Sequence, residues 1–364
     1  MDIVKNLFSK SKLAFHTRKS SHGFQFKSLD GIRGLAVGFV MVGHYCEDLP
    51  LDLGHVGMGV FLFFALSSFL LTFPFYSKES PLYDYKVWLH YFLRRFLRIY
   101  PAYFVILVIL WLYTRGGHEF YGYKFNTSEV LNHLLLLNGY DVFWTMPVEL
   151  KFYLLLPLLV ILFRVIYREN VFNVVYSGCL LCFVYYFVDI YKSVDLLSNM
   201  FVFVMGACTA LAYWRSRDSS WFRKPAVKIS CEASSWAILL YVVLSIPAIW
   251  EFLFINDFHR VIHSKFLHAP LWCIFIFCHL NGVGFLRRLC SFYPLRFIGF
   301  ISFSLYLFHR LTFLILKGKF QHVGLDGEVV VAALVFALTG IIATVSYLVV
   351  EYPFMQLRVR TKNG

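Results

Sequence analysis

Residues 28–46 of the chain read SLDGIRGLAVGFVMVGHYC, an apolar stretch that contains one arginine and one histidine. Arg33 and His44 are eleven positions apart. On an α-helix, eleven steps of 100° bring two side chains to nearly the same face, about 16 Å apart along the axis. Ionisable groups inside an apolar span are costly and therefore candidates for function. The stretch predicts a membrane helix with a cation near one end and an imidazole deep within it.

Two structural roles compete with a functional role for this pair. Arg33 could extend its guanidinium to lipid phosphates while its methylene stem stays in apolar surroundings. His44 could simply donate a hydrogen bond to a backbone carbonyl. The spacing of the two residues favours neither reading, so other residues must decide.

The rest of the chain continues this apolar character. Of its 364 residues, 59% are hydrophobic and 15% are charged, whereas a soluble domain has about 45–50% apolar and 25% charged residues. This composition excludes a soluble globule and predicts one all-α, polytopic integral membrane protein. Windows of about 20 apolar residues predict ten transmembrane helices, near 34–46, 57–76, 96–113, 142–163, 171–190, 196–214, 235–254, 266–285, 296–316 and 328–350. The apolar stretch 129–138 is too short to cross, which predicts an interfacial or re-entrant helix.

The formal net charge of +13 reflects basic residues that the predicted topology places mostly on the cytoplasmic side. With both termini in the cytoplasm and ten crossings, the inner segments hold 25 of the 34 basic residues and the outer loops hold seven. This asymmetry agrees with the positive-inside rule and argues against nucleic acid as a partner. The expected organisation is a basic cytoplasmic arm (1–27), which has no signal-peptide core, a membrane domain (28–357) and a cytoplasmic tail (358–364). The eight cysteines predict no disulfide framework.

Several polar side chains fall near the depth of His44 when each is measured along its own predicted helix. At 1.5 Å per residue, they lie about 12 to 22 Å above the inner ends of their helices. They are Glu149, Ser304, Tyr306 and His309. A carboxylate, two imidazoles, a phenol and a hydroxyl at one level predict a solvated cavity. The alternative is a set of separate polar contacts between helices, which membrane bundles also use.

A second basic group lies at residues 94–98, at the inner end of the predicted third helix. Arg95 and Arg98 are one helical turn apart and can present two guanidinium groups to phosphate oxygens. Such a group would suit the phosphates of a nucleotide-like cofactor. An ordinary positive-inside anchor explains the same spacing, and spacing alone favours that simpler reading.

Five motifs in order make the chain similar to the acyltransferase 3 family, which includes bacterial O-antigen O-acetyltransferases. The Arg-x10-His spacing of Arg33 and His44 is the most specific of them. The other four are the Val-Phe-Leu-Phe-Phe-Ala-Leu-Ser run ending at Ser67, Arg95-x-x-Arg98, Trp144-Thr-Met-Pro-Val-Glu149-Leu-Lys-Phe-Tyr153, and Ser302-Phe-Ser304-Leu-Tyr306-Leu-Phe-His309 with the closing Glu351-Tyr-Pro353. The resemblance covers nearly the whole chain.

The resemblance implies a donor, an acceptor and a set of site residues. The donor is cytoplasmic acyl-CoA, most simply acetyl-CoA, and the acceptor is a hydroxyl of a glycan or lipid-linked glycan such as lipopolysaccharide O-antigen. The expected catalytic residues are His44, Glu149, Tyr306 and His309, and the expected acyl-CoA-binding residues are Arg33, Arg94, Arg95 and Arg98. No permanently bound cofactor and no metal are expected. The expected location is the bacterial inner membrane, among membrane lipids.

Two other classes of function remain compatible with the same residues. A proton-coupled transporter or flippase would use His44, Glu149 and His309 as a proton relay. A scaffold subunit of an export complex would need none of them. The sequence does not specify the acceptor sugar, the acyl chain, the oligomeric state, or the choice between direct transfer and an acyl-histidine intermediate.

Overall fold

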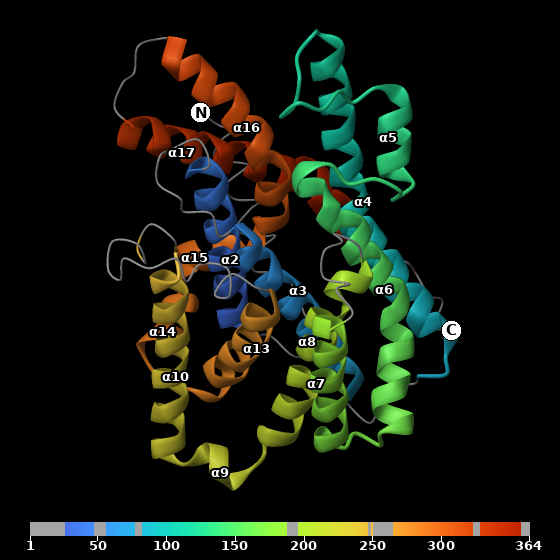
Figure 1. Cartoon of the computed structure of the whole chain (residues 1–364), viewed down its shortest axis with the longest axis vertical. Coiled ribbons are helices and arrows are strands. Elements are labelled where there is room, and N and C mark those ends of the chain that lie inside the picture. Colours follow the sequence, from blue (N-terminus) through green and yellow to red (C-terminus); the bar gives the residue numbers. More distant parts are fainter. Residues whose placement is uncertain are drawn as a thin grey trace. The chain divides into compact units, whose positions relative to one another are not determined.

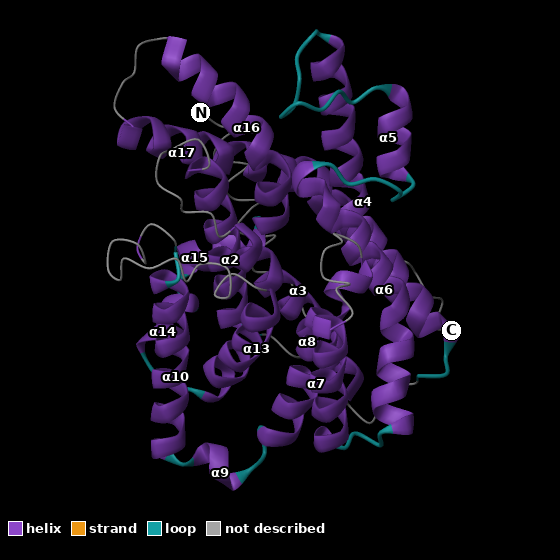
Figure 2. Cartoon of the chain, in the orientation of Figure 1, coloured by secondary structure: helices purple, strands orange, loops and turns teal. Residues whose placement is uncertain are grey.

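A computed structural model describes residues 26–46, 56–76, 82–187, 196–246, 249, 265–322 and 328–357 (Figure 1). Within these ranges the regular elements are all helices, apart from one isolated bridge between Phe120 and Tyr123 (Figure 2). The all-α prediction is therefore confirmed for the described residues. The predicted arm before residue 26 and the predicted tail 358–364 lie outside them.

The helices identify the chain as an integral membrane protein. Among the described residues, six helices are long and apolar enough to cross a membrane, or up to seven if the bent pair Tyr293–Phe300 and Ser302–Phe320 counts as one span. The six are Met58–Tyr76, Tyr85–Arg115, Asp141–Ile166, Leu196–Ser216, Pro225–Leu244 and Val330–Gln356. Two shorter apolar helices cover Val171–Leu181 and Leu267–Asn281. The predicted total of ten crossings, and with it the side of each terminus, stays a prediction.

The chain divides into two compact units, each described by itself. The first contains residues 24–82 and 154–299. Its helices are α2 (Lys27–Cys46), α3 (Val56–Thr72), η1 (Phe73–Tyr76), η3 (Leu162–Ile166), α7 (Val171–Phe187), α8 (Leu196–Ser216), α9 (Ser220–Arg223), α10 (Pro225–Leu244), α13 (Lys265–Asn281), α14 (Phe285–Cys290) and α15 (Tyr293–Phe300). Helix α3 packs between α2 and α8, and α13 packs against α3, α8 and α10. We call this the α2 unit.

The second unit contains residues 83–153 and 300–364. Its helices are α4 (Tyr85–Arg115), α5 (Thr127–Leu134), η2 (Asp141–Trp144), the first half of α6 (Thr145–Ile161), α16 (Ser302–His322), α17 (Glu328–Ser346), η5 (Tyr347–Glu351) and α18 (Tyr352–Gln356). Helix α16 packs against α17 and α4, and α5 packs against α4. We call this the α16 unit.

Helices α4 and α10 begin well before their apolar windows do, and α2, whose window starts at residue 34, begins at Lys27. The helix predicted at 96–113 starts at Tyr85, where the Asp84 side chain accepts a hydrogen bond from the backbone N–H of Lys86 (2.9 Å) and caps the first turn. The helix predicted at 235–254 starts at Pro225, a residue suited to the first helical position. A hydropathy window excludes both N-terminal extensions because they carry charged residues, although Lys and Arg are good helix formers.

Other boundaries agree more closely or differ for a local reason. The helices predicted at 57–76, 142–163 and 196–214 correspond to Met58–Tyr76, Asp141–Ile166 and Leu196–Ser216. The helix predicted at 296–316 is two helices, α15 and α16, which are separated at Ile301. The predicted short helix in 129–138 is α5, which ends earlier, at Leu134. The last residues of the predictions 171–190 and 235–254 lie outside the described part of the chain.

Candidate functional site

Helix α2 carries both Arg33 and His44. It runs without interruption from Lys27 to Cys46, so the two residues share one helix, about 16 Å apart at the standard helical rise. His44 is 9% exposed and lies in the last turn. Arg33 is half-buried, three residues after Asp30, whose carboxylate is 3.8 Å from the guanidinium of Arg296. The start of α2 therefore carries one arginine and one carboxylate, and the carboxylate pairs with an arginine of α15.

Glycines allow the start of α2 to contact its neighbours at backbone distance. A Cβ atom at Gly31 would lie 1.9 Å from the carbonyl oxygen of Cys290, and one at Gly299 would lie 1.6 Å from the carbonyl oxygen of Asp30. A Cβ atom at Gly34 would lie 2.4 Å from the carbonyl oxygen of Leu295. No side chain fits at these distances, so these glycines fix the position of α2, and with it Arg33, against α14 and α15.

In the α16 unit, a pair of aromatic side chains connects α4 to α6. Tyr91, Arg95 and Arg98 follow each other at helical spacing on α4, and the ring of Tyr91 contacts the ring of Tyr153 edge-on, with centroids 6.4 Å apart. The Tyr153 hydroxyl donates a short hydrogen bond to Glu149 Oε1. Arg95 and Arg98 both lie within electrostatic range of that hydroxyl. The structure thus places Tyr153, which bonds to the predicted catalytic carboxylate, within electrostatic range of two predicted phosphate-binding arginines.

Arg94, the third arginine of that group, differs from the other two in its exposure. Arg94 is exposed, whereas Arg95 and Arg98 are half-buried. Helix α4 begins ten residues before Arg95, so this group does not lie at the helix terminus, as predicted, but about 15 Å along the helix. Among the described residues, no three His, Cys, Asp or Glu side chains are close enough to hold a metal ion. The candidate ligand-binding groups on this part of α4 are Arg95 and Arg98, which are half-buried.

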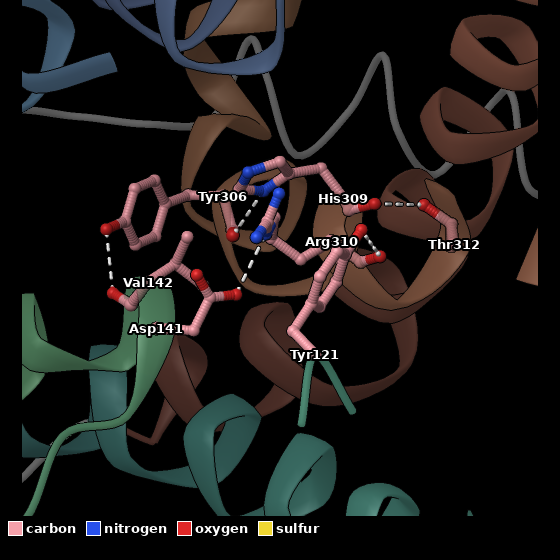
Figure 3. Close-up of polar contacts among 7 residues, drawn as sticks. All are labelled: Tyr121, Asp141, Val142, Tyr306, His309, Arg310 and Thr312. Carbon is pink, nitrogen blue, oxygen red and sulfur yellow. Dashed lines mark hydrogen bonds and ion pairs between the residues drawn. The ribbon is translucent and has the colours of Figure 1, made fainter. Parts of the chain in front are cut away.

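Tyr306 links α16 to the segment before α6 (Figure 3). Its hydroxyl donates to the backbone carbonyl of Val142 (2.8 Å) and accepts from Thr145 Oγ1 (3.1 Å). In the structure this hydroxyl is thus an anchor between two elements. The predicted role of Tyr306 in a proton relay or in stabilising an oxyanion stays a prediction.

His309 is fully buried one turn further along α16. Its Nδ1 lies 2.7 Å from the backbone carbonyl oxygen of Tyr306. A carbonyl can only accept, so Nδ1 carries a proton, and in the neutral ring Nε2 is the basic nitrogen. Figure 3 shows His309 between Tyr306 and Thr312, whose hydroxyl donates to the carbonyl of His309 (2.9 Å). Two side-chain-to-backbone hydrogen bonds within α16 therefore involve His309, one made by its own ring and one made to its carbonyl oxygen.

A buried ion pair lies beside His309, and sequence reasoning missed it. Arg310 Nε donates to Asp141 Oδ2 at 2.8 Å, and the two side chains are only 8% and 13% exposed. The guanidinium carbon of Arg310 also lies 3.6 Å from the centroid of the Tyr121 ring, and the Tyr121 hydroxyl donates to the carbonyl of Arg310 (3.3 Å). Both Tyr121 (φ 47°) and Asp141 (φ 48°) have left-handed backbone conformations. A charged side chain inside an apolar helix needs a partner. The position of Arg310 within such a helix was therefore the sequence signal that could have predicted this ion pair.

A second buried carboxylate pairs with α16 near its start. Ser304 donates to Glu351 Oε1 through a short hydrogen bond and lies 3.3 Å from the Ser346 hydroxyl. Glu351 is 2% exposed and ends the π-helix η5. Sequence reasoning placed Ser304 at the depth of the other polar residues but did not assign it a partner. Of the predicted common cavity, the structure joins Tyr306 to His309 in one cluster and Glu149 to Tyr153 in another.

These features define an integral membrane protein with buried polar groups on several helices, and comparison with known proteins identifies its class. The family described as an acyltransferase domain matches residues 26–350, and the chain belongs to that family. No solved structure matches the chain.

Curated relatives agree with this assignment. The chain is 24% identical to "Peptidoglycan O-acetyltransferase OatA" of Listeria monocytogenes over 78% of its own length and 48% of that protein. It is 24% identical to "Putative peptidoglycan O-acetyltransferase YrhL" of Bacillus subtilis over 92% of its own length and 56% of that protein. It is also 26% identical to "Putative acetyltransferase ORF330" of Acidianus two-tailed virus, over 84% and 88%. The chain thus spans about half the length of the first two relatives.

Proposed function

We propose that the chain is a membrane O-acetyltransferase that moves an acetyl group from cytoplasmic acetyl-CoA to a hydroxyl of a surface polysaccharide at the bacterial inner membrane. The observation that carries the proposal is the placement of Arg33 and His44 on the single helix α2, within a chain that matches the acyltransferase family over residues 26–350. The names of the relatives support acetyl as the acyl group and a glycan as the acceptor.

The reaction requires a base, and His44 has the chemistry for it. A neutral imidazole removes the proton of the sugar hydroxyl, and the oxygen then forms a bond to the thioester carbonyl carbon. The carbon–sulfur bond then breaks, and the CoA thiolate leaves and accepts from the imidazolium the proton that came from the sugar hydroxyl. An acyl-histidine intermediate would use the same nitrogen as a nucleophile. Glu149, Tyr306 and His309 are the other groups to which we assign roles in orienting or relaying the proton.

The arginines suit the donor. Guanidinium groups bind phosphate oxygens through paired hydrogen bonds, and the half-buried Arg95 and Arg98 share one face of α4. We assign them, with Arg33 and Arg94, to the phosphates of acetyl-CoA. The acceptor in this proposal is lipopolysaccharide O-antigen, and peptidoglycan is the second candidate because two relatives are named for it.

Acetyl transfer by the purified full-length protein in lipid vesicles tests the proposal. The protein is supplied with labelled acetyl-CoA and with either O-antigen polysaccharide or peptidoglycan strands. The parent is expected to label one of them, and His44→Ala is expected to lose about 100-fold or more of the rate, which is the contribution of a general base. His118→Ala changes an exposed histidine that stacks on Tyr113 and is the matched control.

The same assay tests the proposed acetyl-CoA site through the KM of arginine variants. Arg95→Gln and Arg98→Gln are each expected to raise the KM for acetyl-CoA about tenfold, the effect of losing one charge-assisted hydrogen bond. Lys86→Gln removes an exposed cation from the same helix and is expected to leave the KM unchanged. A parent protein that binds no acetyl-CoA and labels neither glycan, while it moves a solute or a lipid across the vesicle membrane, would contradict the proposal in favour of a transporter.

A further inference from the structure

The segment between α4 and α6 presents a group of polar and aromatic side chains that the proposed chemistry does not use. We call Tyr123, Glu129, Asn138 and Tyr140 the Tyr123 cluster. The rings of Tyr123 and Tyr140 stack in parallel, with centroids 4.6 Å apart and an interplanar angle of 10°. Glu129 Oε2 accepts hydrogen bonds from the Tyr140 hydroxyl (2.7 Å) and from Asn138 Nδ2 (3.0 Å). A carboxylate, an amide, a phenol and a stacked pair of rings therefore converge on one place.

A buried histidine holds this cluster in a fixed shape. His133 is 0% exposed, and its Nδ1 donates to the carbonyl of Glu129 at 2.8 Å. Its Nε2 accepts from the backbone N–H of Tyr140 at 3.1 Å. One neutral tautomer satisfies both contacts. Helix α5 is capped as well, because the Asn126 side chain accepts from the backbone N–H of Glu129 (2.9 Å). The backbone positions of Glu129 and Tyr140 are thus set before any ligand arrives.

The exposed part of the cluster has the chemistry that a sugar needs. Tyr123 stays 38% exposed although Tyr140 stacks against one face of its ring, so part of this residue is accessible to a ligand. An aromatic face packs against the C–H groups of a pyranose ring, and carboxylate and amide groups pair with its hydroxyls. The four residues of the cluster include no cation, and the adjacent Lys124 is paired with Glu119 (3.2 Å). A phosphate or another anion would meet the carboxylate of Glu129 and be repelled, so an uncharged saccharide fits best.

Exposed leucines on the same segment indicate where the cluster lies with respect to the membrane. Leu131, Leu135 and Leu137 are 53%, 67% and 69% exposed. In a membrane protein, apolar side chains open to the surroundings at the end of a short amphipathic helix belong in the interface between headgroups and acyl chains. The neighbouring Tyr123 cluster then lies at headgroup level. A saccharide carried on a lipid or held close to the membrane surface reaches that level.

We propose that the Tyr123 cluster binds a saccharide ring of the acceptor at the membrane surface, with the ring stacked on Tyr123 and its hydroxyls bonded to Glu129 and Asn138. The identification of this saccharide as the acceptor rests on the proposed function, whereas the binding itself does not.

Direct glycan binding in the absence of acetyl-CoA tests the inference. The full-length protein in lipid nanodiscs is applied to an array that displays chitotetraose, maltotetraose, peptidoglycan strands and O-antigen polysaccharide. The parent is expected to bind at least one of them, and Tyr123→Ala is expected to weaken that binding about tenfold, a reasonable effect for losing one stacked ring. Tyr123→Phe keeps the ring and is expected to bind within about twofold of the parent.

The matched control is Glu119→Gln. Glu119 lies on the same segment, is half exposed and pairs with the exposed Lys124 (3.2 Å), so its variant is expected to bind like the parent. A parent that binds none of the glycans, or a Tyr123→Ala protein that binds as tightly as the parent, would overturn the inference. Because acetyl-CoA is absent, acetyl transfer can succeed when this binding fails, and binding can succeed when transfer fails.

Discussion

Arg310 and Asp141 form a buried ion pair, with Nε 2.8 Å from Oδ2, that joins α16 to η2 at the turn next to His309. The two side chains are 8% and 13% exposed. Removing one partner of such a pair leaves the other charge buried without compensation, which typically costs about 3–5 kcal/mol. The pair therefore holds the segment before α6 against the helix that carries Tyr306 and His309.

Asp141→Asn is expected to lower the unfolding temperature of the detergent-solubilised protein clearly, because the cation of Arg310 stays buried. Arg310→Met combined with Asp141→Asn is expected to recover part of the loss, since no charge then remains in the site. Thermal unfolding of the parent, both single variants and the double variant measures this coupling. Strictly additive losses would show that the two residues do not act as a pair.

Gly31→Ala is expected to disrupt the start of α2, because the added Cβ atom would lie 1.9 Å from the carbonyl oxygen of Cys290. The helix must then move away from α14, and Arg33 moves with it. Gly38→Ala on the same helix meets nothing within 4 Å and is the matched control. Alanine is a better helix former than glycine by at most about 1 kcal/mol, so the control is expected to be as stable as the parent or slightly more stable. Equal thermal stability of both variants would show that the contact at Gly31 is not limiting.

Tyr306→Phe separates the anchoring role of the hydroxyl from a catalytic one. The carbonyl of Val142 loses this donor but still accepts from Thr145 Oγ1 (3.1 Å), so the variant is expected to cost about 0.5–1.5 kcal/mol of stability. Thr145→Val removes the other hydrogen bond of the same hydroxyl but keeps the phenol. If Tyr306 takes part in proton transfer, Tyr306→Phe loses acetyl transfer while Thr145→Val retains it. Equal, modest losses of rate in the two variants would assign Tyr306 to anchoring alone.

Acid is expected to loosen the segment that carries the Tyr123 cluster. Burial lowers the pKa of His133 below its usual 6.5, and the hydrogen bond from Tyr140 lowers the pKa of Glu129 below its usual 4.5. For both groups the unfolded segment binds protons more readily than the folded one. Their stabilisation is present above the unfolded pKa values and is lost as the pH falls below about 6.5 and then below about 4.5.

Hydrogen exchange of residues 119–141 at pH 7.5 and pH 5.5, corrected for the intrinsic rate, measures this effect. Protection is expected to fall at pH 5.5 in the parent. The exposed His118 is the control, since His118→Gln is expected to leave the difference between the two pH values unchanged. Protection that does not depend on pH in the parent would contradict the assignment of His133 as a buried neutral histidine.

Much of the helical architecture follows from apolar runs alone. The helices at Met58–Tyr76 and Leu196–Ser216 were predicted within two residues because their charged residues lie at or beyond the ends. Helices α4 and α10 extend further than predicted because a hydropathy window rejects charged turns that still form helix. The break at Ile301 has no such signal in the apolar pattern.

The candidate site was only partly predictable because a sequence gives the depth of a side chain along its helix but not the rotation of that helix. Position along a helix gives depth, and the structure buries both Tyr306 and His309, which were predicted at a similar depth. Which side chains meet depends on the rotation of each helix about its axis, and rotation depends on packing. The partnerships of Arg310 with Asp141 and of Ser304 with Glu351 therefore emerge only from the structure.

The composition of the surface glycan tests the central claim most directly. Cells that carry this chain, cells that lack it and cells that carry His44→Ala are compared by mass spectrometry of their purified O-antigen and peptidoglycan. The account predicts one acetyl group per modified sugar in the first sample, and its absence from both other samples. Identical glycans in all three samples would contradict the claim that this membrane protein acetylates a glycan through His44.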